Sequence, residues 1–334
     1  MEFKKYSSIE NSYNEKLINF IHMNGADLGK FYVSQKIHGS NFSLITDGTD
    51  IREAKRSSII GVSENFQGSL AIVERLRIPI INLFQYMKKL DPEVESIQVY
   101  GEIFGGSYPH PDVPKVQAPR IQKGIFYCPG TEWLAYDIRV NGGKFVDADE
   151  KYGLFRIAEV PHIKVLFRGT FNECLNYPND FQDTIHGYFN LPTIEDNVCE
   201  GVVITPAREI VIGHSRIVLK NKNEKWKEKS REPKKVKNPQ IYGPDLVKAM
   251  EEVSKYVTEN RFLNVLSKEG EFKSMSQFGP LMKAFSIDVL EAFEEDNEDL
   301  LSVLGNIERR NMNKVVNGLV ANIIKEYIPV VQDA

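Results

Sequence analysis

Among the residues that could take part in catalysis, the lysine at the end of one strand-like segment has the most suggestive sequence neighbours. Lys36 follows the apolar pair Tyr32 and Val33 and opens the pattern Lys-x-His-Gly-Ser-Asn, which ends at Asn41. A lysine that only faces solvent needs neither the glycine nor the asparagine. As a free amine, however, a lysine can attack phosphorus and carry a covalent intermediate. The pattern Lys-x-x-Gly alone also arises by chance in a protein of ordinary composition. Its functional interpretation therefore depends on the other polar residues of the chain.

Other polar residues stand at the ends of apolar, strand-like segments farther along the chain. They are Arg56 in AKRSS, Glu102 in YGEIFGG, Tyr136 and Asp137 in LAYDI, Glu200 in EGVVI, and Lys220 and Lys222 in VLKNK. Two lysines that alternate on a strand face the same side. Beside Lys36 they would favour its neutral, nucleophilic form and offset the charge of a phosphate. The alternative is a basic strand edge that discourages aggregation.

The two glutamates have separate chemical uses. Glu102 precedes a glycine-rich turn, where a carboxylate can accept hydrogen bonds from hydroxyl groups. Glu200 opens a buried strand, Val202 to Ile204, and a carboxylate there can hold Mg²⁺, which prefers oxygen ligands. The alternatives are purely structural roles. Glu102 would then stabilise a turn or cap a helix, and Glu200 would be an ordinary acidic residue of a loop.

These six segments, in this order and spacing, resemble the nucleotidyltransferase motifs of covalent polynucleotide ligases. The resemblance is closest to the RNA ligase 2 family, the ATP-dependent nick-sealing RNA ligases of bacteriophage and kinetoplastid editing. GEIFGGSYPHP resembles the editing branch, and YVTENRFLNVLSKEGE resembles the C-terminal domain of the phage enzyme. The resemblance implies an α+β fold, with an antiparallel-sheet nucleotidyltransferase (ATP-grasp-like ligase) domain followed by a small all-α domain.

The resemblance also implies a role for each matching residue. Lys36 would be the nucleophile, with Arg56, Lys220 and Lys222 as the catalytic cations that also contact the nucleotide. The ATP site would comprise the peptide groups of Gln35 and Ile37 on the adenine edge, His38, Asn41 near the phosphate, Glu102 on the ribose hydroxyls, Tyr136 stacked on adenine, and Asp137. Glu200 would bind Mg²⁺, with Mn²⁺ able to replace it. Core packing is the rival for Tyr136 and for His38.

One position departs from the family pattern. Members often have a basic residue two positions before the nucleophile, and this chain has Ser34. If that basic residue grips the RNA or its 5′-phosphate, sealing should be weaker here, or another cation should substitute. Adenylylation of Lys36 should be affected less.

The implied function is an ATP-dependent RNA ligase. It would join 3′-hydroxyl and 5′-phosphate RNA ends, at nicks in duplex RNA, through a lysyl-AMP intermediate and an adenylylated RNA 5′ end. One rival is a DNA ligase or a capping-type nucleotidyltransferase, which would usually have an OB-fold after the last motif. The other is a non-catalytic protein that binds RNA ends with a ligase fold, because fold does not guarantee function.

The elements that position these residues can also be predicted. Residues 31–220 show many short apolar runs and few helical patterns, which favours an antiparallel α+β domain. NFSLITDGTDIREAKR alternates on both sides of Asp47-Gly48, which is typical of a hairpin. From Leu246 onward, apolar residues recur at helical spacing. We therefore predict an adenylyltransferase domain at 1–240, with a basic hinge at 225–240, and a helical domain at 241–334 that engages RNA.

The charge along the chain bears on how RNA would bind. Residues 220–237 contain nine Lys/Arg and three Glu, whereas 241–334 contain 16 acidic and 10 basic residues. An acidic helical domain cannot hold RNA by net charge alone. We therefore expect the hinge from Lys225 to Lys237, together with Arg261 and Lys268, to contact phosphates. A solvated linker is the alternative for the hinge.

Composition limits the remaining possibilities. The chain has 334 residues, is 42% hydrophobic and 26% charged, and has a net charge of −4, so it can bury a core and any basic surface must be local. Its three cysteines have irregular spacing and fit buried thiols in a reducing compartment. We find no signal-peptide pattern and no membrane-length apolar run. We expect a monomer without an obligate protein partner, cytoplasmic or otherwise intracellular, and an organelle is compatible.

Overall fold

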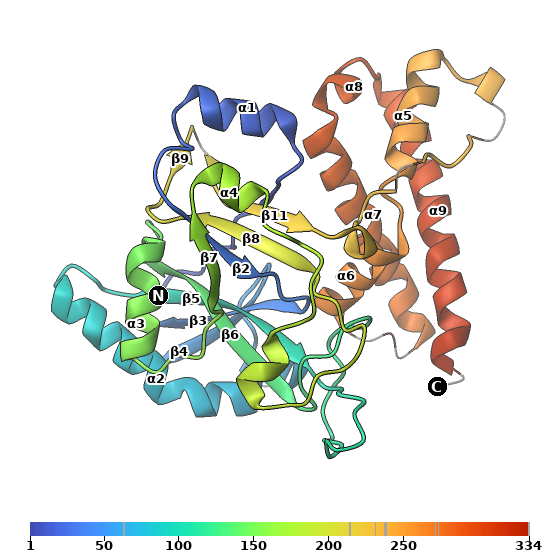
Figure 1. The fold of residues 1–334 in the computed structure, drawn as a ribbon. Coiled ribbons are helices and arrows are strands. Elements are labelled where there is room, and N and C mark those ends of the chain that lie inside the picture. The colour runs from blue at the N-terminus through green and yellow to red at the C-terminus, as the bar shows by residue number, and fades with distance from the viewer. Residues whose placement is uncertain are drawn as a thin grey trace. The chain divides into compact units, whose positions relative to one another are not determined.

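The computed structural model of this chain divides into two compact units, Met1–Lys225 and Trp226–Ala334. The structure describes residues 1–62, 64–213, 215–230, 232–236, 239–270, 272 and 274–332. The described part of the first unit contains two larger β-sheets and a two-stranded one, and the second unit contains the helices shown in orange and red in Figure 1.

A four-stranded antiparallel sheet forms one half of the first unit. Its strands, in spatial order, are β4 (Ile51–Lys55), β3 (Ser40–Thr46), β5 (Ile97–Gly105) and β6 (Thr131–Val140). The predicted hairpin at Asp47-Gly48 is confirmed, since β3 pairs with β4 across it. Gly48 takes the positive φ of 92° that the turn requires, and the Asp47 carboxylate accepts the amide hydrogen of Thr49 at 3.1 Å.

A five-stranded sheet forms the other half of the unit. Its order is β1 (Glu10–Asn11), β11 (Leu219–Lys222), β8 (Gly201–Pro206), β2 (Phe31–Gln35) and β7 (Val165–Gly169), and a separate hairpin pairs β9 (Val211–Ile212) with β10 (Ser215–Arg216). All its pairings are antiparallel except β1 with β11. The predicted α+β class with antiparallel sheets is confirmed.

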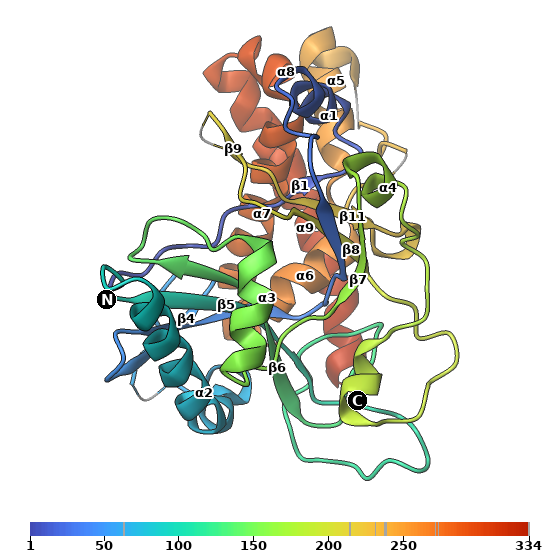
Figure 2. The ribbon, with the colours of Figure 1, turned by 60° about the vertical axis from the view of Figure 1, so that its left-hand side comes forward.

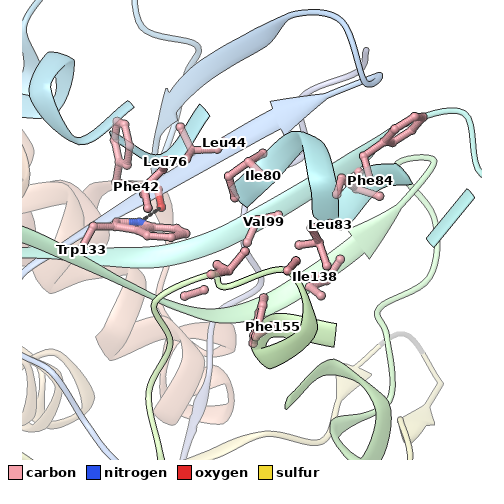
Figure 3. Close-up of a cluster of buried hydrophobic side chains, with 14 of the residues drawn as sticks. Phe42, Leu44, Leu76, Ile80, Leu83, Phe84, Val99, Trp133, Ile138 and Phe155 are labelled. Atoms are coloured by element: carbon pink, nitrogen blue, oxygen red, sulfur yellow. Dashed lines mark hydrogen bonds between the residues drawn. The ribbon is translucent and has the colours of Figure 1, made fainter. Parts of the chain in front are cut away.

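Two helices cover the four-stranded sheet and make its core. They are α2 (Ser69–Leu90) and α3 (Ala148–Ile157), and Figure 2 shows both of them against this sheet. Figure 3 shows Ile80 and Leu83 of α2 directed at Val99 of the sheet. In the same core, the Trp133 indole donates a hydrogen bond of 3.0 Å to the Phe42 carbonyl. Apolar side chains of α2 and of the sheet are therefore buried together in one core.

The remaining helices of the first unit are short. They are α1 (Glu15–Met23) and α4 (Phe171–Leu175), with 3-10 turns η1 (Phe66–Gly68), η2 (Ile185–Phe189) and η3 (Glu224–Trp226). Ile21 and Phe171 pack with the apolar face of the five-stranded sheet in a separate core cluster. The two sheets thus have separate apolar cores.

The second unit is helical in all its described residues that have regular structure. Its elements are η4 (Pro239–Ile241), α5 (Pro244–Ser254), α6 (Glu259–Glu269), η5 (Met275–Gln277), α7 (Phe278–Asp296), α8 (Glu298–Ser302) and α9 (Asn306–Gln332). Its core includes Leu246, Met250 and Val253, the positions with predicted helical spacing. Among the described residues, no helix has the length and apolar character to cross a membrane.

The unit boundary differs from the one predicted after residue 240. Residues 226–230 and 232–236 pack with the helices, because Val236 joins their core and the Glu228 carbonyl accepts hydrogen bonds from the Thr258 hydroxyl and the Arg261 guanidinium. The backbone amide of Ser230 also donates to the Lys255 carbonyl at 2.8 Å. The described hinge residues after Lys225 therefore belong to the helical unit, while Arg231, Lys237 and Asn238 lie outside the described residues.

Candidate active site

Lys36 is placed by the pairing of three strands. It follows directly after β2, and its backbone amide donates to the Gly201 carbonyl at 2.9 Å, where β8 begins. In turn, Gly201 pairs with Lys222 of β11. Gly201 has a φ of 136°, and a Cβ there would lie 2.1 Å from the Asn221 carbonyl oxygen, so only glycine fits this close approach. The register therefore brings three distant segments to the same sheet end.

Glu200 is the centre of an ion cluster at this end. Its two oxygens lie 2.8 Å from the Lys36 ammonium and 2.7 Å from the Lys222 ammonium, and His38 Nδ1 is 3.6 Å away. The Glu200 side chain is only 1% exposed. Burial by itself would raise the pKa of this carboxyl, but Lys222 and Lys36 outweigh burial and hold the pKa well below its ordinary value. The structure thus brings together four predicted residues.

The glycine of the Lys-x-x-Gly pattern has a steric reason. A Cβ on Gly39 would lie 2.3 Å from the Ile103 carbonyl oxygen and 3.0 Å from Glu102 Cγ. Gly39 therefore lets the segment after Lys36 lie directly on β5, beside Glu102. Burial raises the pKa of Glu102 to about 7, and the Glu200 charge adds to this, whereas Lys36 and Arg56 act in the opposite direction. Glu102 and Arg56 thus share one electrostatic environment with Lys36.

A bulge in the four-stranded sheet presents Tyr136. The register between β5 and β6 shifts at Tyr100/Gly101, whose partners are Asp137 and Ala135, so Tyr136 is the extra residue. Its hydroxyl accepts a hydrogen bond from the Asn41 side-chain amide. Asn41 itself pairs with Glu102 across the sheet, so the two side chains leave the same face. The structure therefore brings Asn41, Glu102 and Tyr136 together.

Gln35, Ile37 and Ser34, the other residues around the nucleophile, are buried. The Gln35 side chain bonds to Asp183 and Thr184, which leaves its peptide group as the part predicted to read adenine. Ser34 lies within β2, paired with Val203, so the position that is often basic in the family is inside the sheet here. Lys220 is two residues before Lys222 on β11, on the same face.

Asp137, which the resemblance predicts to contact the nucleotide, has its own set of charged partners. Its carboxylate lies 3.1 Å from the Lys151 ammonium and 2.6 Å from the Arg216 guanidinium, and it accepts the Tyr6 hydroxyl hydrogen at 2.9 Å. Burial opposes ionisation, but the two cations outweigh it and lower the pKa of Asp137. The Asp137 carboxylate thus belongs to a buried ion network with Lys151 and Arg216.

Two residues predicted to contact RNA phosphates are also engaged inside the helical unit. Arg261 is buried, and its guanidinium is 2.8 Å from one oxygen of Asp288 and 3.6 Å from the Glu228 carboxylate. Lys268 is 3.0 Å from the other Asp288 oxygen. Both cations therefore have carboxylate partners within the helical unit, and their contact with RNA phosphates stays a prediction.

The site offers one buried carboxylate, that of Glu200, as a ligand for a metal ion. Within the described ranges, no group of three or more His, Cys, Asp or Glu side chains could hold one. Glu200 is a single buried carboxylate, which suits Mg²⁺, because this ion commonly binds one or two carboxylates together with nucleotide phosphates and water. A metal at Glu200 would therefore depend on the nucleotide for its other ligands.

Several residues around the site had no signal in the sequence. Tyr127 accepts the His38 amide hydrogen at 2.9 Å, and Asp183 binds the Gln35 side chain. Lys151 and Arg216 complete the network around Asp137. Each contact joins residues far apart in the chain, so no local spacing pattern could have revealed them.

Comparison with known proteins gives matches along both units. The profile described as "RNA ligase" matches residues 29–222, and the profile "T4 RNA ligase 2 C-terminal" matches residues 243–304. RNA-editing ligase 2, mitochondrial, of Trypanosoma brucei brucei is 28% identical, over 94% of this chain and 88% of that protein. RNA-editing ligase 1, mitochondrial, of the same organism is 31% identical, over 62% of this chain and 51% of that protein. This chain thus spans about half of the second relative's length.

Solved structures of a Naegleria gruberi RNA ligase are similar in part. The structure with PPi is 16% identical, covers 67% of this chain and 57% of that chain, and has a TM-score of 0.46. A mutant with ATP and Mn is also 16% identical, with 66% and 56% covered and a TM-score of 0.44. This chain therefore spans less than two thirds of that ligase.

Proposed function

Because the chain belongs to the RNA ligase family, we propose that it is an ATP-dependent enzyme that seals RNA ends through an adenylate on Lys36. The observation that carries the proposal is the cluster of Lys36, Glu200 and Lys222, which combines a nucleophile, a buried carboxylate and a second cation within 2.8 Å contacts. Its substrates would be a 3′-hydroxyl and a 5′-phosphate, at nicks in duplex RNA.

The first proposed step forms lysyl-AMP. The neutral amine of Lys36 attacks the α-phosphorus of ATP, a nitrogen–phosphorus bond forms, and the bond to the β-phosphate breaks so that pyrophosphate leaves. Lys36 loses one proton. Lys222 and Arg56 would stabilise the charge on the phosphate oxygens. Glu102 would accept hydrogen bonds from the ribose hydroxyls, and Tyr136 would pack on the adenine ring.

The next two steps move AMP to RNA and release it. An oxygen of the RNA 5′-phosphate attacks the lysyl-AMP phosphorus, which breaks the nitrogen–phosphorus bond and gives an adenylylated 5′ end. The 3′-hydroxyl then attacks the RNA 5′-phosphorus, and AMP leaves. All three steps are in-line phosphoryl transfers with similar geometry, so one set of cations can serve each of them.

Glu200 would hold Mg²⁺, or Mn²⁺ in its place, together with the nucleotide phosphates. When bound, the ion would neutralise phosphate charge, and its positive charge would favour the neutral amine of Lys36. For the residues themselves, the structure supports a simple division of roles. Lys36 bonds to phosphorus, Glu200 orients Lys36 and Lys222, and Lys222 faces the charge that develops.

The proposal is tested by sealing of a nicked duplex RNA that carries a labelled 5′-phosphate. The wild type should convert the nick to a continuous strand when ATP and Mg²⁺ are present, and Lys36→Ala should not. A matching nick in duplex DNA separates this function from a DNA ligase. Equal or faster sealing of DNA would contradict the proposed RNA substrate.

A further inference from the structure

The side chain of Gln35, directly before the nucleophile, is hydrogen-bonded to a loop from much later in the chain. Its amide nitrogen donates to Asp183 Oδ1 at 2.6 Å. Its carbonyl oxygen accepts from the Thr184 amide at 2.9 Å and from the Thr184 hydroxyl at 2.8 Å. Gln35 and Asp183 are both 1% exposed. A buried amide with three good hydrogen bonds has one defined orientation.

Asp183 is the centre of this loop. The same Oδ1 accepts the Ile185 amide at 3.0 Å, and Oδ2 accepts the His186 amide at 3.1 Å and lies 3.1 Å from His186 Nδ1. The Asp183 backbone amide donates to the Asn197 carbonyl at 2.8 Å. Charge-assisted hydrogen bonds of this kind are stronger than neutral ones, so the loop is a rigid partner for Gln35.

The backbone after Gln35 is held from other directions. Lys36 donates its amide hydrogen to Gly201, and His38 donates its own to the Tyr127 hydroxyl. The backbone on both sides of Lys36 is therefore fixed by groups outside its own strand.

We propose that Asp183 and Thr184 form a clasp that positions Lys36 for attack, by fixing Gln35 at the end of β2. The clasp comprises the side chains of Gln35, Asp183 and Thr184. Asp183 and Thr184 are positioning residues that act through Gln35. This inference rests on the proposed formation of lysyl-AMP, and it adds residues that neither the sequence pattern nor the ion cluster includes.

The experiment measures the single-turnover rate constant for lysyl-AMP formation from α-labelled ATP in the full chain. The rate constant describes only the protein molecules that react. A misfolded fraction therefore lowers the amount of product but leaves the rate constant unchanged. Gln35→Glu puts a second carboxylate against Asp183 and should slow adenylylation about 10²-fold, as expected for a displaced nucleophile. Thr184→Val removes one neutral hydrogen bond and should slow it about fivefold.

A paired variant and a control complete the test. Gln35→Glu combined with Asp183→Asn restores one donor and one acceptor between the two positions, so the rate constant should recover about tenfold over Gln35→Glu alone. Asp180→Asn removes an exposed carboxylate from the same loop and should leave the rate constant unchanged.

The outcomes separate the two proposals. Rate constants for Gln35→Glu and Thr184→Val within about twofold of a wild type that labels normally would overturn the clasp alone. If Gln35→Glu fails to fold, Thr184→Val decides the matter by itself. Absence of labelling in the wild type, including after treatment with pyrophosphate, would overturn the proposed function and the clasp together.

Discussion

At the scale of single residues, Glu200 determines how the charged groups of the site are arranged. Two lysines share this buried carboxylate, and a buried ion pair by itself adds little stability compared with apolar packing. The arrangement is therefore better explained by a need for two cations and one carboxylate at one place. Single-residue changes should separate their contributions.

Replacing Glu200 with Gln should reduce both stability and chemistry. The change leaves two largely buried ammonium groups without their carboxylate, which should lower the free energy of unfolding by about 3 kcal/mol at neutral pH. Lysyl-AMP formation should fall by about 10²-fold or more. Chemical denaturation and the labelling assay measure the two effects.

The pH dependence of that stability difference follows from the depressed pKa of Glu200. An acid whose pKa is lowered by folding adds stability above its ordinary value of 4.5, and this stability is lost as the pH falls through the depressed value. The advantage of the wild type over Glu200→Gln should thus be complete at neutral pH and should shrink in acid. A pH-independent difference would contradict the ion-pair account.

Glu102 should titrate in the neutral range because its pKa is raised to about 7, mainly by burial. If its carboxylate accepts the ribose hydroxyls, adenosine should bind more tightly as the pH rises through about 7 and Glu102 loses its proton. Adenosine is the suitable ligand because it has no phosphate that titrates there. Calorimetry should show a flat profile for Glu102→Gln, and an inflection retained in that variant would assign the titration to another group.

At the scale of elements, sequence periodicity predicted the hairpin of β3 and β4 and the helix that begins near Leu246. Both have local patterns, a turn dipeptide or apolar spacing, that a short window of sequence contains. The bulge at Tyr136 was not predictable, because it depends on how β5 and β6 align across the sheet. The clasp joins Gln35 and Asp183, which are 148 positions apart, so no short window of sequence contains a pattern that predicts it.

Gly39 gives an element-scale prediction, since it sets how closely the segment after Lys36 approaches β5. Gly39→Ala would place a methyl group 2.3 Å from a backbone oxygen that cannot move away without disturbing the sheet. We expect a loss of about 2 kcal/mol in the free energy of unfolding and a large drop in lysyl-AMP formation.

A matched control is Gly153→Ala. Gly153 lies within α3, and a Cβ there would meet nothing within 4 Å. The same substitution should therefore stabilise the protein by about 0.5–1 kcal/mol through helix propensity. Thermal unfolding of the two variants measures the contrast. Equal effects at both positions would mean that the close approach at Gly39 has no special role.

At the scale of the whole molecule, the chain divides into compact units after Lys225, whereas the sequence predicted a domain boundary after residue 240. The charged composition of 225–240 indicated a linker, whereas Val236 and the Glu228 carbonyl bind this segment to the helices. Composition does not show which apolar residue in a charged run is buried. A truncation that removes the helical unit should therefore end at Lys225.

A chain that ends at Lys225 should keep self-adenylylation and lose nick sealing. The residues proposed to form lysyl-AMP all lie in the first unit, and the helical unit is predicted to engage RNA. A chain that ends at residue 240 should be less soluble, because it retains Val236 without its core. Full sealing by the 1–225 chain would contradict a role of the helices in RNA engagement.

The most direct test of the central claim is incubation with α-labelled ATP or GTP and Mg²⁺, followed by a denaturing gel, for the wild type and Lys36→Ala. Protein purified in the adenylylated form would first be treated with pyrophosphate. We predict a labelled band from ATP alone that is absent in the variant. A band from GTP instead, or a band that persists in Lys36→Ala, would contradict attack by Lys36 on ATP. No band from either nucleotide would remove the covalent mechanism.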